Sequence, residues 1–400
     1  MDFKFHRKIL DNGLTILFEK RNLPIVSVAF AVRNGGVNEA SDEKGISHFI
    51  EHMLYKGTPR RNSKKISEEI EKNGGELNGF TSEEITAFWC KMPSQHLNVA
   101  LDVLGDMMKN PLFDEKECDK EREVIFEEIK MRKDTPRIYV SDRILDIMYG
   151  EPFGLDLIGT YDTMNSISRE KLVKRFKEVY APDNMVICVV GDANFEEIVG
   201  FAEKNFGKEK SNIQKFEIKL KNEEKVEKRK NIDQANLIFA YHTPLIGDKK
   251  SYAAYLLNTL MAGGMSSRLF SEIRVKRNLA YSIKGDESIS REFSFNTIYV
   301  GTKKENVEKV KSLILEEFKK VSMSLEEKEL NETKEQIIGN HLIRMEDSQE
   351  QVVNLLTWEM NGDANEFYNF KKNIEDVKLD DVKELAKIKK YSFFALVPEE

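Results

Sequence analysis

The second half of the chain repeats the pattern of the first half. A short apolar run, a helical pattern and a glycine follow one another over residues 25–57, and the same series returns over residues 235–264. Phe113-Asp-Glu-Lys-Glu and Leu325-Glu-Glu-Lys-Glu each begin a long charged helical pattern. The offset from Gly57 to Gly264 is only slightly shorter than the offset from Phe113 to Leu325. A nearly constant offset is typical of a duplicated domain with small insertions, so we expect two homologous domains.

Within each half, strand patterns are interleaved with helical patterns. Asp11-Asn-Gly between two alternating apolar runs predicts a hairpin near the N-terminus. Further expected elements in the first half are helices near 41–55, 64–72, 96–108 and 114–133 and strands near 25–33 and 84–92. Hairpin-connected strands among helices favour an α+β architecture over a doubly wound parallel sheet. A Lys- and Glu-rich segment at 207–230 indicates a boundary, and we expect domains at 1–210 and 225–400 joined by a linker at 211–224.

Charge and composition exclude several classes of partner. The 400 residues carry a net charge of −7, which argues against binding to nucleic acid or to anionic membranes. One basic cluster departs from this acidic total, and we assign it no nucleic-acid role: Lys56, Arg60, Arg61, Lys64 and Lys65. No apolar run approaches the roughly 18 residues of a membrane span, and the N-terminus lacks the apolar stretch of a signal peptide. The 3 cysteines form no C-x-x-C pair, which fits a reducing compartment, so we expect a cytoplasmic protein without a membrane partner.

The clearest chemical signal is His48-Phe-Ile-Glu51-His52. Residues four apart on a helix share a face, so both imidazoles can reach one zinc ion while Glu51 lies beside the open coordination position. Zinc lowers the pKa of water bound to it toward about 7, and a carboxylate can then take its proton. This H-x-x-E-H order is the inverzincin signature. With 6 histidines in the chain, we estimate that chance produces the pattern in roughly one such chain in a hundred.

A catalytic zinc needs a third protein ligand, and a later acidic helix offers two candidates. Glu121 and Glu128 are seven residues apart and therefore share a face of that helix. One of them can bind the metal while the other orients a histidine. Acidic helices are more often simply solvated, and the spacing leaves the two assignments open.

With these residues in place, the chain resembles the pitrilysin/insulinase family of zinc metallopeptidases. It is most similar to the short branch that includes mitochondrial processing peptidase and its bacterial and archaeal relatives. That family has a glutamate at a characteristic distance after H-x-x-E-H, and Glu128 lies at that distance from His52. The resemblance implies that His48, His52 and Glu128 are the zinc ligands. It further implies that Glu51 is the general base and that Glu121 does not bind the metal itself but orients a ligand histidine.

Two further motifs carry the same resemblance. Residues 74–84 are similar to the family's edge strand, which binds extended substrate by adding a strand, although local preference alone predicts a loop at 74–82. The implied substrate-binding residues are Asn78, Gly79, Phe80 and Thr81. The family usually has alanine at the position of Gly79, a departure that we expect to leave main-chain pairing intact.

The second half matches the family's C-terminal motif in Ala262-Gly-Gly-Met-Ser-Ser-Arg-Leu-Phe, Glu272-Ile-Arg274 and Leu279-Ala-Tyr281-Ser. The resemblance implies that Arg274 and Tyr281 reach toward substrate. A guanidinium suits a peptide carbonyl, and a phenol can donate to the oxyanion that forms on it. On local pattern alone they would be a helix-end cation and a strand residue. The repeat places no metal ligand opposite those of the first half, so we expect one zinc ion per chain.

The implied fold is α+β, with two homologous α/β-roll domains of the processing-peptidase-like metallohydrolase type whose antiparallel or mixed sheets pack with helices. The first domain would bind zinc, and the second would carry the Arg/Tyr motif without metal. The implied function is a zinc-dependent endopeptidase that acts on unfolded or short peptides. Two alternatives stay open: a non-catalytic scaffold subunit of a related complex, and a maturase dedicated to one leader peptide.

A two-domain chain of this type implies a partner subunit. In longer family members four such domains lie in one chain, and the Arg/Tyr pair comes from the last of them. Here Arg274 and Tyr281 of one subunit would lie over the zinc of another. Because this chain keeps both motifs, we expect a homodimer, with a heterodimer formed with a degenerate paralogue as the alternative.

Overall fold

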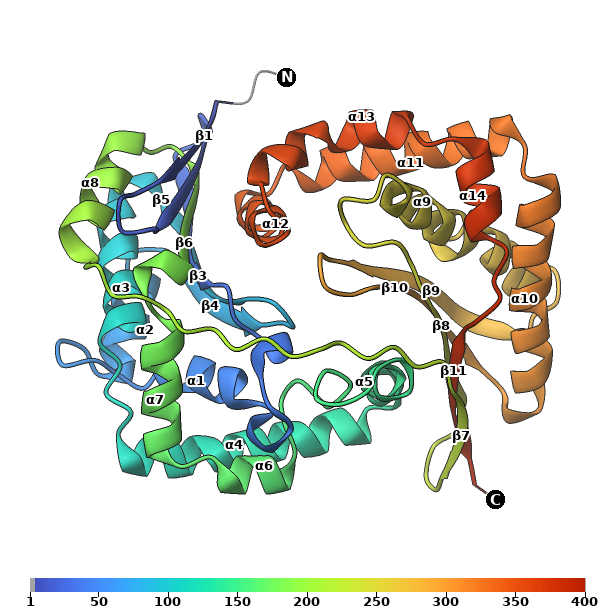
Figure 1. The fold of residues 1–400 in the computed structure, drawn as a ribbon, viewed down its shortest axis with the longest axis horizontal. Coiled ribbons are helices and arrows are strands. Elements are labelled where there is room, and N and C mark those ends of the chain that lie inside the picture. Colours follow the sequence, from blue (N-terminus) through green and yellow to red (C-terminus); the bar gives the residue numbers. More distant parts are fainter. Residues whose placement is uncertain (1–3, 400) are drawn as a thin grey trace. The chain divides into compact units, whose positions relative to one another are not determined.

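Two mixed sheets organise the chain in the computed structural model, which describes residues 4–399. Each sheet forms, with its helices, one of two units (Figure 1). The first unit contains the chain up to Ile129, Leu157–Glu217 and Arg344–Phe367. The second contains Lys130–Asp156, Ile218–Ile343 and the chain from Tyr368 onward. Among residues 4–399, no helix has both the length and the apolar character that crossing a membrane requires.

The first unit has a six-stranded sheet in the order β1-β2-β6-β3-β5-β4. Its strands are β1 (Phe5–Ile9), β2 (Thr15–Lys20), β3 (Ile25–Val32), β4 (Glu76–Thr81), β5 (Thr86–Pro93) and β6 (Met185–Gly191). The predicted hairpin joins β1 to β2, with Gly13 at a positive φ of 94° that suits glycine. β2 and β6 are parallel and the other pairs are antiparallel. β4 lies at the edge of the sheet. It falls within the segment that local preference predicts as a loop, so that local prediction is wrong and the strand implied by the resemblance is confirmed.

Alternation along β3 separates the two faces of this sheet. Val28 and Phe30 point into an apolar core shared with most helices of the first half, whereas Ser27 meets Ser348 on the opposite face. The helices of the first half are α1 (Ile46–Leu54), α2 (Ser63–Glu71), α3 (Leu97–Lys109), α4 (Glu115–Asp134), α5 (Pro136–Met148), α6 (Tyr161–Ser166), α7 (Arg169–Val179) and α8 (Phe195–Asn205). In Figure 1, α3 and α8 lie on one side of the sheet and α12 (Ser348–Met360) on the other.

The second unit repeats the first sheet without the counterpart of β1. Its order is β7-β11-β8-β10-β9, in which β7 and β11 are parallel just as β2 and β6 are. The strands are β7 (Glu224–Arg229), β8 (Ala235–His242), β9 (Ala280–Ile289), β10 (Ser294–Thr302) and β11 (Ser392–Pro398). The helices are α9 (Lys250–Ala262), α10 (Val307–Ser324), α11 (Glu327–Arg344), α13 (Phe370–Glu375) and α14 (Leu379–Leu385). The predicted pair of homologous α+β domains is confirmed, and part of the expected boundary segment forms β7.

Each half of the chain contributes one helix to the other unit. α12 packs on β3, β5 and β6, while α5 packs on β8 and β11 (Figure 1). The ring of Tyr139, on α5, lies 6.1 Å from that of Phe394, on β11. The two helices are counterparts, because α5 begins at Pro136 and α12 at Ser348, the same offset that separates Phe113 from Leu325. The division at residues 1–210, 211–224 and 225–400 stays a prediction about the duplicated sequence, since the units themselves exchange these helices.

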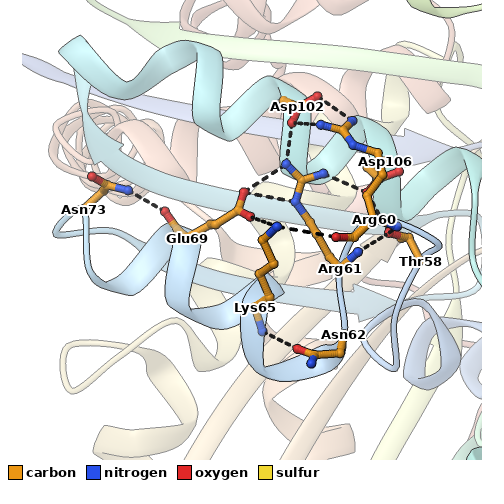
Figure 2. A network of polar contacts seen from close by, with 9 residues as sticks. All are labelled: Thr58, Arg60, Arg61, Asn62, Lys65, Glu69, Asn73, Asp102 and Asp106. Carbon is orange, nitrogen blue, oxygen red and sulfur yellow. Dashed lines mark hydrogen bonds and ion pairs between the residues drawn. The ribbon is translucent and has the colours of Figure 1, made fainter.

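The two arginines of the basic cluster are paired with carboxylates and are not free cations (Figure 2). Arg61, only 5% exposed, donates to Asp106 at 2.7 Å and to Glu69 at 2.9 and 3.0 Å, and it also pairs with Asp102. The Thr58 hydroxyl donates to the same Asp106 carboxylate at 2.7 Å. Arg60 pairs with Asp102 at 2.8 and 2.9 Å from a position that is 57% exposed. The network therefore ties the segment between α1 and α2 to α3.

Arg60 and Arg61 provide a matched test of what burial adds to an ion pair. We expect Arg61→Met to lower the free energy of unfolding by about 3 kcal/mol, because it leaves the buried Asp106 carboxylate without its cation. Arg60→Met should lower that free energy by less than about 1 kcal/mol, since its pair is solvated. Urea unfolding of both variants measures the difference. Equal losses would contradict a structural role specific to Arg61.

Candidate metal centre

Helix α1 carries both histidines of the H-x-x-E-H motif. Its apolar residues recur at helical spacing and are buried, which turns the histidines toward α4: Ile46, Phe49, Ile50, Met53 and Leu54. His48 and His52 lie one turn apart, with their Nε2 atoms 3.2 Å from each other. Glu128 Oε2, on α4, lies 3.4 Å from His48 Nε2 and 3.8 Å from His52 Nε2. The structure thus brings the three predicted ligands together.

These three residues fit a metal ion. Donors held at about 2.0–2.2 Å around a tetrahedral zinc ion are about 3.3 Å apart, and the three observed separations are 3.2, 3.4 and 3.8 Å. Two imidazoles and one carboxylate are also a donor set of catalytic zinc sites. Among the residues that the structure describes, this is the one group of three or more His, Cys, Asp or Glu ligand atoms that converges in this way.

Glu121 and Glu128 take different positions, which spacing alone left open. Glu121 Oε2 lies 3.0 Å from Nδ1 of His52, on the side of the ring away from Glu128, and its Oε1 lies 2.5 Å from Lys56 Nζ. Burial would raise the pKa of the Glu121 carboxyl, but the hydrogen bonds from His52 and Lys56 outweigh it and lower that pKa. An ionised Glu121 can accept a hydrogen bond only from a protonated Nδ1, and this tautomer of His52 leaves the Nε2 lone pair facing Glu128.

Glu51 lies on α1 between the two histidines and faces the edge strand. Its Oε2 accepts a hydrogen bond from the Thr81 hydroxyl at 2.6 Å. Burial raises the pKa of the Glu51 carboxyl above its ordinary value, against the opposing effect of the Thr81 hydrogen bond. The site therefore places a partly buried carboxylate beside the three potential ligands.

A buried carboxylate that the sequence analysis missed sets the start of α1. Glu39 accepts hydrogen bonds from the backbone N–H groups of Gly45 at 3.0 Å and Ser47 at 2.8 Å. An anion at this end of a helix also meets the favourable end of the helix dipole. Lys44, with no exposed surface in its side chain, lies 4.0 Å from Glu39 and donates to the Gly36 carbonyl at 3.0 Å. An acid a few residues before a helix is the only sequence signal for this arrangement, and it is a common one.

The edge strand β4 presents the four predicted substrate residues. Asn78 and Phe80 alternate with Gly79 and Thr81, which face α1. β4 pairs with β5 on one side, and no other described strand covers its second side. A Cβ atom at Gly79 would lie 2.6 Å from the Tyr55 hydroxyl, so the position of Tyr55 leaves no room for a side chain at residue 79. The register across Gly79 is regular, opposite Phe88, as expected for intact main-chain pairing.

Arg274 and Tyr281 both belong to the second unit. Arg274 lies in a π-helical turn (Phe270–Val275), with its guanidinium 4.9 Å from the centre of the Phe270 ring. Tyr281 lies on β9, an edge strand, and is 54% exposed. Its ring packs against Gly301 of β10, where a side chain would lie 2.9 Å from the ring. The expected role of both residues toward substrate stays a prediction.

Glu83 follows β4, and few neighbouring groups stabilise a negative charge on its carboxyl. Its Oε2 accepts no hydrogen bond from residues 4–399, and the nearest cation, Lys44 Nζ, is 3.9 Å away. Burial raises the pKa of the Glu83 carboxyl to about 7, against the opposing effect of Lys44. The carboxyl after the edge strand therefore changes charge near neutral pH.

Comparison with known proteins identifies relatives along most of the chain. Residues 15–161 match the family described as Insulinase (Peptidase family M16), and residues 166–337 match the Peptidase M16 inactive domain. The uncharacterized zinc protease YmxG of Bacillus subtilis is 34% identical over 346 residues, which cover 85% of this chain and 84% of the relative. An uncharacterized zinc protease of Rickettsia felis is 32% identical over 355 residues, covering 86% and 85% of the two chains.

Solved structures share the fold. A protease from Helicobacter pylori superposes with a TM-score of 0.90 at 23% identity, over 99% of this chain and 100% of its own. A peptidase M16 inactive domain from Pseudomonas fluorescens superposes with a TM-score of 0.89 at 19% identity, over 99% of both chains. At these identities the likeness concerns the arrangement of the elements.

Glu83 makes stability depend on pH in a predictable direction. An unfolded glutamate titrates near pH 4.3, so its raised folded-state pKa favours folding below that pH, and the advantage is lost as the pH rises through about 7. Glu83→Gln, which stays neutral, should therefore be more stable than wild type at pH 8 by about 3 kcal/mol, with little difference at pH 4. Urea unfolding at the two pH values measures this. Glu76→Gln, at the exposed start of β4, is the control, and an equal response from both variants would contradict the assignment.

Proposed function

Because the chain belongs to the insulinase (M16) family of peptidases, we propose that it is a zinc-dependent endopeptidase that hydrolyses unfolded or short peptides. The observation that carries the proposal is the convergence of His48, His52 and Glu128, with Glu51 beside them. The names of the relatives, uncharacterized zinc proteases, support a metallopeptidase in general.

His48, His52 and Glu128 would hold the zinc ion. When bound, zinc supplies a Lewis acid that polarises a peptide carbonyl and makes water more acidic. Glu121 keeps the His52 ring oriented through its Nδ1 atom, while Lys56 holds Glu121. These two residues keep the Nε2 donor atom of His52 in place before any ion arrives.

Glu51 is the proton carrier in this proposal. As general base it takes a proton from the water that attacks the scissile carbonyl, and it then donates that proton to the leaving amine. Its partial burial suits this exchange, since a raised pKa brings a carboxyl closer to the working pH. Arg274 would bind a substrate carbonyl and Tyr281 would donate to the oxyanion.

The uncovered side of β4 suits an extended substrate. A peptide that adds a strand there would hydrogen-bond to the main chain of residues 78–81. Such pairing requires a segment of substrate with no hydrogen bonds of its own, so folded proteins should be poor substrates. Main-chain pairing selects conformation more than sequence, which leaves specificity to the side chains around the strand.

Two alternatives remain as competing proposals. A non-catalytic scaffold subunit is suggested by the inactive-domain family that matches residues 166–337. Against it, the candidate ligands and Glu51 all lie in the first unit, where they converge. A maturase dedicated to one leader peptide would use the same chemistry and differ only in its substrate.

Peptide hydrolysis with and without Glu51 tests the proposal. A mixture of unstructured peptides should be cut by wild type and not by Glu51→Gln at equal measured zinc content, with a loss of at least about 100-fold, because the base is removed while the ligands remain. A chelator should abolish wild-type activity, and added zinc should restore it. Equal cleavage by both proteins would show that Glu51 is not the base. No cleavage by zinc-loaded wild type would favour the scaffold or maturase alternative.

We also infer a homodimer with two composite sites, and complementation tests it. Glu51→Gln and Arg274→Ala proteins, each inactive alone, should regain about a quarter of wild-type activity when unfolded and refolded together in equal amounts. Half of the random dimers would then be mixed, and each would contain one intact site. Recovery of no activity would contradict the shared site and favour a heterodimer with a paralogue.

A further inference from the structure

One hydroxyl joins the edge strand to the candidate base. Thr81 is the last residue of β4, and its Oγ1 donates to Glu51 Oε2 at 2.6 Å. The other acceptor within reach is Thr86 Oγ1, which is 3.5 Å away and itself donates to the Asn34 carbonyl at 3.1 Å. A hydroxyl has a single proton, and the shorter, charge-assisted contact is the stronger one. The Thr81 proton is therefore committed to Glu51.

No other described hydroxyl does this for Glu51. Burial raises the pKa values of Tyr55 and Tyr180, and the nearby Glu51 charge adds to that rise. Their hydroxyl oxygens are buried and make no hydrogen bond within residues 4–399. The orientation of the Glu51 carboxylate thus depends on a single donor from the strand.

This bond distinguishes the two oxygens of Glu51. Oε2 already accepts the Thr81 hydrogen bond, so Oε1 has the greater remaining capacity and is the preferred oxygen to accept a proton. Reaction geometry is sensitive to small displacements, and an error of about 1 Å in a reacting group can cost about 100-fold in rate. A carboxylate free to rotate about its side-chain torsions would place neither oxygen reliably.

We propose that Thr81 is a positioning residue whose hydroxyl aims Glu51 Oε1 at the attacking water, in addition to the main-chain pairing of Thr81 with substrate. The inference rests on the proposed function of Glu51 as base. It couples substrate binding to chemistry, because the strand that pairs with the peptide also holds the base. If a bound peptide displaced β4 from its place beside α1, the Thr81 hydrogen bond would break and Glu51 would lose its orientation.

Thr81→Val and Thr81→Ser separate the hydroxyl from the rest of the side chain. Valine keeps the volume and removes the donor, so we expect kcat to fall by about 10- to 100-fold with KM and zinc content near those of wild type. Serine keeps the donor and should restore most of that loss. Thr58→Val is the matched control: it removes a hydroxyl-to-carboxylate bond of 2.7 Å to Asp106, within the ion-pair network, and should leave kcat unchanged.

A second readout does not depend on activity. Thr81→Val and Glu51→Ala each remove the same hydrogen bond, so their effects on the urea midpoint should be clearly non-additive in the double variant. Additive effects, a kcat of Thr81→Val within twofold of wild type, or a serine variant as impaired as the valine variant would each overturn the proposal. If wild type cuts no peptide, the proposed function fails, while the double-mutant cycle still decides whether Thr81 holds Glu51.

Discussion

The position at which α1 begins determines the geometry of the candidate metal centre. An α-helix turns by about 100° per residue, so a start displaced by one residue would rotate His48 and His52 away from α4. The Glu39 carboxylate opposes such a displacement, because it binds two backbone N–H groups at the start of the helix. Gly45, just before the helix, has a positive φ of 92°, which favours glycine. A Cβ atom at this position would lie only 2.6 Å from the Ile158 carbonyl oxygen.

Buried charges are the second constraint, since each is unfavourable unless it has a partner. Glu39 has backbone donors and Lys44, Glu121 has His52 and Lys56, and Glu51 has Thr81. Glu83 Oε2 accepts no such hydrogen bond from the described chain. The elements that hold the site are thus connected by polar contacts, and an apolar core supports them from the other side of α1.

Much of the first unit was predictable from local pattern. Periodicity predicted α1 to α4 within a few residues at most boundaries, and the Asn-Gly turn predicted the first hairpin. The edge strand was not predictable in this way, because glycine and asparagine around residues 74–79 favour turns, and pairing with β5 overrides that preference. Only the resemblance to a known family indicated it. The exchange of α5 and α12 between the units was missed, because amphipathic patterns do not say which sheet a helix covers.

The sequence by itself specifies the candidate site residues through their short-range spacing. Two histidines are four residues apart with a glutamate between them, and two further glutamates are seven residues apart on a later helix. Those spacings are visible in sequence because helical faces repeat at fixed intervals. Folding assigned the roles within that set. Glu128 faces Nε2 and Glu121 faces Nδ1 of the same ring, and Thr81 meets Glu51 across thirty positions of sequence. Such assignments depend on how α4 and β4 pack against α1, and packing between distant segments leaves no periodic trace in the sequence.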